Sequence, residues 1–162
     1  MNPYSTLRPS LRPITGDDLP VLFQVYASTR QEELAQVPWT DAQKEAFLRQ
    51  QFEAQHAWWS DNYTGATFDV IEVGGSPAGR FYVHRGPRAI RVVDIALLPA
   101  HRGSGIGARL LRELFAEGDG AGKPVSVHVE KFNRARTLYD RLGFREVEDK
   151  GVYVLMERSV GG

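Results

Sequence analysis

The sequence predicts an α/β protein in which strands and helices build one mixed sheet, with most strand pairs antiparallel and one pair parallel. Two observations predict this class. Residues 67–98 are rich in β-branched and aromatic residues and are broken by two turn-like segments, which indicates three strands in an antiparallel meander. The chain then continues as strand, helix and strand, and such a connection makes its two strands parallel neighbours.

The composition is that of one folded domain, residues 1–162. Hydrophobic residues make up 42% and charged residues 25%, which indicates neither disorder nor a fibrous repeat. Lys plus Arg and Asp plus Glu each total 20, so no net charge attracts nucleic acid or a membrane. The absence of cysteine excludes disulfides, thiolate metal ligands and a thiol nucleophile. No apolar run reaches about 18 residues, so we expect a cytoplasmic protein without membrane contact.

The amino-terminal part is expected to hold an extended arm, a first strand and two helices. Thr15 is expected to cap the first helix, with Asp17 and Asp18 near its positive end. Thr40 and Gln43 match the capping box of the second helix. The apolar positions that support these helices are Leu19, Val21, Leu22 and Val25 in the first, and Phe47, Leu48 and Phe52, beside Gln51, in the second.

The carboxyl-terminal part is expected to continue as helix, strand, helix and two strands. The first of these helices, about a dozen residues long, should end at Glu117. Its core face repeats every fourth residue, at Ile106, Leu110 and Leu114. Alternating valines predict a strand over residues 124–130, and Gly143 should stop a short helix over residues 133–142. Two closing strands flank a turn at residues 149–151.

The segment HRGSGIGARLL, residues 101–111, places three glycines in five positions ahead of a helix. Gly103, Gly105 and Ala108 fit a dinucleotide fingerprint, but that motif needs an acid about 20 residues on, where this chain has His128. A nucleotide-hydrolase phosphate loop needs Gly-Lys before Ser or Thr, which is absent. In a purely structural role, the glycines would only make a close turn and let the helix pack tightly against the sheet. This role is disfavoured, because each glycine costs roughly 1 kcal/mol relative to alanine in a helix. We therefore interpret the stretch as a helix start whose free N–H groups bind phosphate oxygens.

The wider segment LLPAHRGSGIGARLL resembles the acyl-CoA motif of the GCN5-related N-acetyltransferase (GNAT) superfamily, whose pattern Arg102, Gly105 and Gly107 fill. The segment NRARTLYDRLGF is similar to the family's Asn-containing stretch with its Tyr and its Gly-Phe ending. The resemblance covers roughly residues 67–158, with a weaker match at LRPITGDDLP. It implies the GNAT fold, a mixed and mostly antiparallel sheet with a splayed parallel strand pair and helices on both faces.

The resemblance implies acetyl-CoA as the acyl donor. Its pyrophosphate would bind the backbone amides of Arg102, Gly103, Ser104, Gly105, Ile106, Gly107 and Ala108. Its pantetheine would lie like an added strand against the main chain of Ala96, Leu97 and Leu98. Asn133 would bond near the pantetheine arm. Asn133 precedes Tyr139 by six residues where many members have seven, so either Asn133 lies before the helix or its contact differs.

The resemblance also implies the chemical roles. Tyr139 would protonate the leaving thiolate as general acid, and the Leu97 amide would donate to the thioester oxygen. Tyr139 could instead be an ordinary half-buried tyrosine. Asp94 interrupts an apolar run and is the candidate general base, with a pKa raised by burial; the alternative pairs it with Arg80 or Arg91. Further candidates for the base are Glu32, Glu33 and His128.

The sequence thus predicts an N-acetyltransferase in which a primary amine attacks acetyl-CoA directly in a ternary complex. The alternative is a non-catalytic acyl-CoA sensor or partner-binding module. The acceptor would be a small-molecule amine or a protein amino group, held by Glu32 and Glu33 and walled by Trp39. The aromatic group Trp58, Trp59 and Tyr63 could line the acceptor pocket or close the subdomain, and we expect the second. The remaining histidines are His56, His84 and His101, and they lack the spacing of metal ligands, so we expect no metal. The sequence leaves open whether the protein forms a homodimer.

Overall fold

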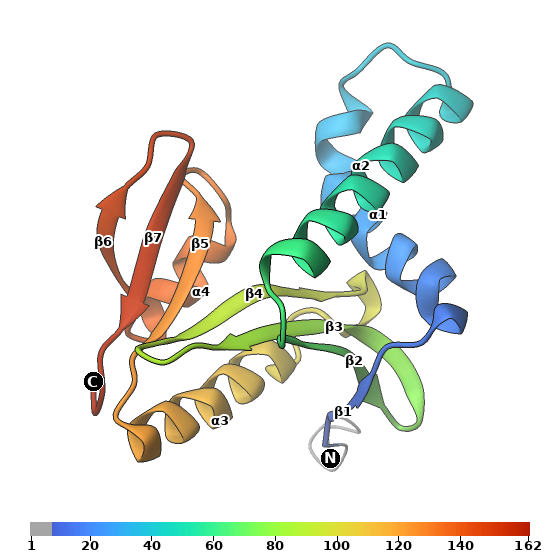
Figure 1. Cartoon of the computed structure of the whole chain (residues 1–162). Coiled ribbons are helices and arrows are strands. Elements are labelled where there is room, and N and C mark those ends of the chain that lie inside the picture. The colour runs from blue at the N-terminus through green and yellow to red at the C-terminus, as the bar shows by residue number, and fades with distance from the viewer. Residues whose placement is uncertain (1–7) are drawn as a thin grey trace.

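The computed structural model describes residues 8–162, whose strands form one seven-stranded sheet (Figure 1). The strands are β1 (Ser10–Pro13), β2 (Thr67–Val73), β3 (Ser76–Arg85), β4 (Ile90–Leu97), β5 (Val125–Glu130), β6 (Arg145–Asp149) and β7 (Tyr153–Arg158). Their order across the sheet is β1-β2-β3-β4-β5-β7-β6. Only β4 and β5 are parallel, and all other neighbours among the described strands are antiparallel. The predicted fold class and its three-stranded meander are confirmed.

Helices cover both faces of this sheet, as the resemblance implied. The helices α1 (Leu19–Ala35) and α2 (Asp41–Asn62) lie on one face, and α3 (Ile106–Ala121) and α4 (Ala135–Arg141) lie on the other (Figure 1). The larger core lies under α3 and α4 and includes Val92, Leu111, Val127, Tyr139 and Met156. A smaller core under α1 and α2 consists of Leu22, Tyr26, Phe52 and Val70. Within residues 8–162, no helix is both long enough and apolar enough to cross a bilayer.

The first helix begins later than Thr15 predicts. Gly16–Asp18 form a 3-10 turn, and α1 starts only at Leu19. A continuous α-helix from Gly16 would place Pro20 in its interior, where the proline ring would clash with the Gly16 carbonyl. Thr15 is the N-cap of this turn, and its amide donates to the Asp18 carboxylate at 2.7 Å as in a capping box.

Two other local signals behave as predicted. The Gln43 amide donates to Thr40 Oγ1 at 3.1 Å, and the Thr40 amide donates to Gln43 Oε1 at 2.9 Å, which completes the capping box of α2. Gly143 follows Leu142, the C-cap of α4, and has φ of 97°, in the left-handed region that glycine adopts without steric cost. Both signals depend only on neighbours in sequence.

The prediction that α3 ends at Glu117 is wrong, because the helix runs on to Ala121. Gly118 lies inside it and packs so closely on the next segment that a Cβ would come within 2.6 Å of the Lys123 carbonyl oxygen. The helix ends at Gly122, which has φ of 68°, and the Lys123 amide donates back to the Gly118 carbonyl. The glycine that suggested an end is therefore the one that lets the helix approach the sheet.

Candidate active site

The site is organised by a gap between the two parallel strands. The pairing of β4 with β5 covers three residue pairs, Ile90 with Val125, Arg91 with Ser126, and Val92 with Val127. Beyond that point β4 continues to Leu97 and β5 to Glu130 without pairing to each other. The register of β3 against β4 skips Val93, which marks a β-bulge where the parallel pairing ends. Figure 1 shows the two strands diverging from this point.

The main-chain groups that face this gap belong to alternate residues of β4. The Leu98 amide donates to the Ala78 carbonyl of β3 at 2.8 Å. In an antiparallel pair the N–H and C=O of every second residue point to the same neighbour, so Ala96 also faces β3. The N–H and C=O groups of Ile95 and Leu97 therefore point to the open side. Ile95 was missed by the sequence analysis, because no sequence signal tells which of two adjacent residues turns its amide to which strand.

A glycine on β3 allows this part of β4 to approach β3 closely. A Cβ at Gly79 would overlap the Ala96 carbonyl oxygen, so the close approach of the two strands requires glycine. Gly79 pairs with Leu97 in the sheet register. In the sequence, Gly79 is the last residue of the turn-like segment GGSPAG, residues 74–79, and nothing there indicates this close approach.

Unpaired backbone amides line the start of α3, at the end of the gap. The first amide bonded within the helix is that of Arg109, which donates to the Gly105 carbonyl at 3.0 Å. Gly103 and Gly105 have φ of 75° and 84°, which only glycine adopts readily. The amides of residues 103–108 have no backbone acceptor among the described residues. The Arg102 amide was also predicted to bind the pyrophosphate, but it is not free, because it donates to the Pro99 carbonyl at 3.2 Å.

The Arg102 side chain links this loop to β4 and α1. Its Nε donates to the Leu97 carbonyl at 3.0 Å, and its Nη2 donates to Ser28 Oγ at 2.9 Å. In the same loop the Ser104 hydroxyl donates to the His101 carbonyl at 2.8 Å. The loop is therefore held from within and from α1 while its amides stay free for an anion.

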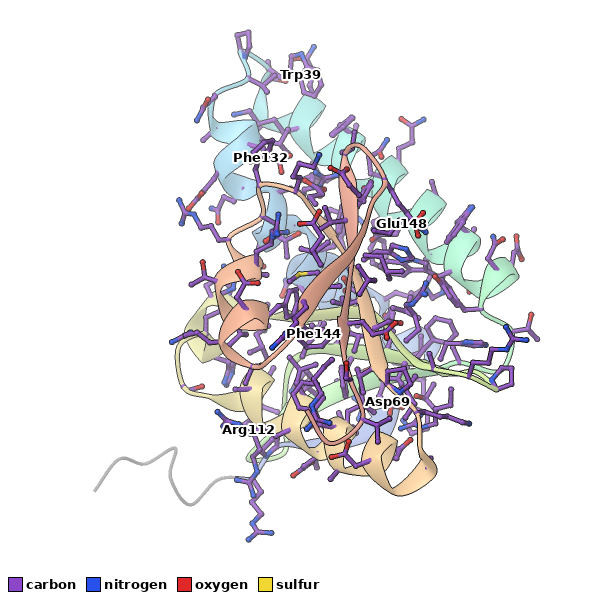
Figure 2. The ribbon with its side chains drawn as sticks, turned by 90° about the vertical axis from the view of Figure 1, so that its left-hand side faces the viewer. Trp39, Asp69, Arg112, Phe132, Phe144 and Glu148 are labelled. Atoms are coloured by element: carbon purple, nitrogen blue, oxygen red, sulfur yellow. The ribbon has the colours of Figure 1, made fainter. Side chains whose placement is uncertain are left out.

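Tyr139 lies buried on α4, with 6% of its surface exposed. Its ring packs against Phe144, which lies beside α4 in Figure 2, at 5.4 Å between ring centres. Burial raises the pKa of the Tyr139 phenol, and the charge of Asp94 raises it further. The Tyr139 hydroxyl has no hydrogen-bond partner among residues 8–162. The completely buried side-chain polar atoms without a partner in these residues are two others, Tyr82 Oη and His101 Nδ1. The phenol is thus protonated at neutral pH.

Asp94 is paired with Arg80, one of the two partners proposed from the sequence. The Arg80 Nε donates to Asp94 Oδ2 at 2.6 Å, and the Arg80 side chain is only 4% exposed. The guanidinium carbon of Arg80 lies 5.2–5.8 Å from three ring centres, those of Tyr26, Trp59 and Tyr82. A buried cation needs a counter-charge, and Asp94 supplies it. The other carboxylate oxygen, Oδ1, has no partner within the described part of the chain.

Asn133 lies just before α4, in the first of the two arrangements that its spacing from Tyr139 left open. The side-chain oxygen of Asn133 accepts a hydrogen bond from the backbone amide of Ala135 at 2.8 Å. The backbone amide of Asn133 donates to the Glu130 carbonyl at 3.0 Å. In this arrangement the Asn133 side chain satisfies a free amide at the helix start.

The acidic residues expected to hold the acceptor are both paired with arginine. Glu32 lies 3.1 Å from Arg134, and Glu33 lies 2.9 Å from Arg30. The first pair joins α1 to the segment before α4, with side chains that are 76% and 88% exposed. Such exposed pairs contribute little to stability, so they are easily exchanged for another partner.

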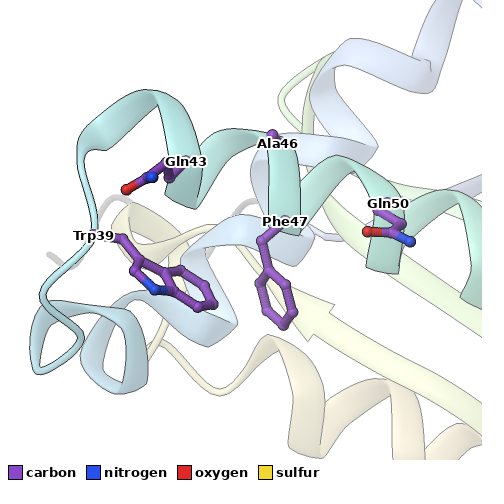
Figure 3. A pocket seen from close by; sticks show the side chains of 5 residues that line it. All are labelled: Trp39, Gln43, Ala46, Phe47 and Gln50. Carbon is purple, nitrogen blue, oxygen red and sulfur yellow. The ribbon is translucent and has the colours of Figure 1, made fainter.

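Trp39 borders an open hollow of about 330 Å³ on α2. Figure 3 shows its lining side chains, Trp39, Gln43, Ala46, Phe47 and Gln50. The rings of Trp39 and Phe47 meet edge to face with centres 5.4 Å apart. Apart from Trp39, none of the residues predicted for the site lines this hollow.

The aromatic residues at the end of α2 pack mostly on β3. Trp59 meets Tyr82 at 5.6 Å between ring centres, and Tyr63 meets His84 at 5.5 Å. Trp58 contacts Tyr63 and is 56% exposed. In residues 8–162, no three His, Asp or Glu side chains gather in a way that could hold a metal ion.

A sheet opened between two parallel strands, with free amides at a helix start beside the opening, has the backbone donors that an extended ligand with phosphate groups needs. The sequence model of the "Acetyltransferase (GNAT) family" matches residues 28–144, which is more than half of the chain. The protein therefore belongs to the GNAT acetyltransferase family. No curated protein matches the chain.

Solved structures share the fold at low sequence identity. The PaiA N-acetyltransferase from Thermoplasma acidophilum, in complex with coenzyme A, gives a TM-score of 0.71 at 17% identity, over 93% of this chain and 98% of that one. An acetyltransferase from Thermus thermophilus gives 0.68 at 22% identity, over 94% and 97%. The ribosomal-protein-S18-alanine N-acetyltransferase from Escherichia coli gives 0.61 at 18% identity, over 94% of both chains. At these identities the likeness is one of fold.

Proposed function

We propose that this protein is an N-acetyltransferase that transfers the acetyl group of acetyl-CoA to a primary amine by direct attack in a ternary complex. The observation that carries the proposal is the gap between β4 and β5, where main-chain groups of Ile95 and Leu97 turn to the open side and lead to the free amides at the start of α3. Family membership and the coenzyme A complex of the Thermoplasma relative support it.

The residues present fit the donor. Residues 103–108 would hold the pyrophosphate through backbone amides, and the positive end of α3 favours the same anion. The main chain of Ile95 would bond the pantetheine as a strand does, while Ala96 and Leu98 would contribute through their side chains. Asn133 would reach the pantetheine arm from the start of α4. Bound acetyl-CoA supplies an activated thioester carbonyl.

Three groups of this chain would then act on the reaction. The Leu97 amide would donate a hydrogen bond to the oxygen that becomes negative in the transition state. Asp94, through Oδ1 or a bridging water, would take the proton of the attacking amine. Tyr139 would give its proton to the departing thiolate, for which its raised pKa suits it, since the phenol stays protonated at neutral pH. The chain has no cysteine, so direct attack is proposed without a thioester intermediate on the enzyme.

Thiol release from acetyl-CoA, measured across a panel of primary amines, tests the proposal. We expect amine-dependent release in the wild type and in Tyr63→Phe, a control at the far end of α2, and slow release in Tyr139→Phe. Coenzyme A binding should be measured in parallel by calorimetry. Binding without turnover by any amine would favour the acyl-CoA sensor, and absence of binding would overturn both functions.

A further inference from the structure

Three basic side chains meet on the sheet face that carries α1 and α2. Val92 and Val127 point into the core on the α3 side. Since successive side chains of a strand point to opposite faces, Arg91 on β4 and His128 on β5 point to the other face. Lys150 joins them from the turn between β6 and β7.

The hydrogen bonds within this group leave donors in excess. Arg91 Nη1 lies 3.1 Å from His128 Nδ1, and Lys150 Nζ lies 3.1 Å from His128 Nε2. A neutral imidazole has one lone pair, so it accepts from one of these cations and not from both. Arg91 Nε donates to Ser126 Oγ at 2.8 Å, while its Nη2 has no acceptor among residues 8–162. Two cationic groups thus converge on a ring that satisfies only one of them.

The charges around the ring do not balance. Burial lowers the pKa of His128, and the charges of Arg91 and Lys150 lower it further, while Glu148 alone acts in the opposite sense. Figure 2 labels Glu148 on the β6–β7 hairpin. The neighbouring carboxylate, Asp149, is already paired with Lys131 at 2.7 Å. Glu130 and Glu157 lie on the same sheet face, yet among residues 8–162 neither Arg91 nor Lys150 is paired with a carboxylate. With His128 neutral, these two unpaired cations suit a ligand group that carries a negative charge.

The cluster lies next to the gap. His128 directly follows the last residue of β5 that pairs with β4. On β4, Asp94 lies three residues beyond Arg91, or about 10 Å along the strand. The two side chains share a face because the bulge at Val93 inserts one extra residue between them. An acceptor whose amine enters the gap near Asp94 could therefore extend an anionic group to these side chains.

We propose that Arg91, His128 and Lys150 form a subsite for a carboxylate of the acceptor, so that the preferred substrates are amines that carry a carboxylate, such as amino acids. The proposal rests on the acetyltransferase function. It predicts discrimination against polyamines, whose additional positive charges would be repelled by Arg91 and Lys150. The guanidinium and ammonium groups supply the charge-assisted hydrogen bonds that a carboxylate accepts.

Binding can be tested without catalysis by NMR of the histidine rings, of which the chain has four. His128→Gln assigns the His128 signals. The probe is N-acetylglycine, titrated at constant ionic strength, with N-acetylglycinamide as the uncharged match. We expect a saturable shift of the His128 signals with the carboxylate and none with the amide. Lys150→Gln should weaken this binding about tenfold, whereas Lys123→Gln, on the α3–β5 connection, should not change it.

A kinetic arm then separates this proposal from the proposed function. For an amino acid that is acetylated, kcat/KM should fall about tenfold in Lys150→Gln, and that for its carboxamide should stay unchanged. An unsaturable or unchanged His128 signal with N-acetylglycine, or a shift preserved in Lys150→Gln, overturns the subsite. If no amine is acetylated while the NMR shift is present, the subsite stands and the transferase function fails.

Discussion

Gly105→Ala, matched with Gly65→Ala, tests whether the glycine loop serves ligand binding or only the fold. Both glycines have φ of 84°, and a Cβ at either position would meet nothing within 4 Å. Alanine in the left-handed region costs roughly 1–2 kcal/mol, so both variants should lose the same stability. For a chain of this size that corresponds to a Tm lower by about 2–8 °C.

The two variants should differ in coenzyme A affinity. The same cost pushes φ at position 105 towards negative values, which redirects the amides of Gly105 and Ile106 at the start of α3. Each lost hydrogen bond to a charged phosphate oxygen costs about 1.5–3 kcal/mol, so Kd should rise about 10- to 100-fold. Gly65 lies between α2 and β2, and its replacement should leave Kd unchanged. Calorimetric titration beside thermal unfolding gives both quantities. Wild-type affinity in Gly105→Ala, or equal losses in both variants, would refute the assignment of these amides to the pyrophosphate.

Three further changes have defined outcomes. Tyr139→Phe should lower kcat about 10²- to 10⁴-fold, because the general acid is lost. The variant should keep its stability, because the Tyr139 hydroxyl has no hydrogen-bond partner in the described structure. An unchanged rate in a thiol-release assay over pH 6–9 removes Tyr139 as the acid. Gly79→Ala should reduce turnover, because its Cβ displaces Ala96 and with it the Leu97 amide; unaltered kcat in a variant that unfolds like the wild type would contradict that coupling. Asp18→Asn should cost about 1–3 kcal/mol in urea unfolding at pH 7, because Arg12 and the Thr15 amide bond this buried carboxylate and hold its pKa below the usual range. The carboxylate's contribution is present above the unfolded pKa near 4 and is lost as the pH falls, so the two proteins should differ less at pH 3 than at pH 7.

The parts of the fold that sequence predicted correctly depend on neighbours along the chain. The Thr40 and Gln43 pair, the stop at Gly143 and the alternation of valines in β5 are contacts or conformations within a few residues. The failures came where a distant segment competes with the local signal. Gly118 reads as a helix end, yet it lies inside α3 because the helix must pack closely against the segment that enters β5.

For the candidate site, the sequence by itself determined the glycine loop, the helix that follows it and the order of elements that makes β4 and β5 parallel, because each is written in local spacing and turn chemistry. Only the tertiary structure decided that Ile95 and Leu97 face the gap, that Asp94 is bound to a buried Arg80, and that Arg91, His128 and Lys150 converge. The reason is physical: strand register, burial and charge pairing are set by groups far apart in the chain, and their energies exist only once those groups are brought together.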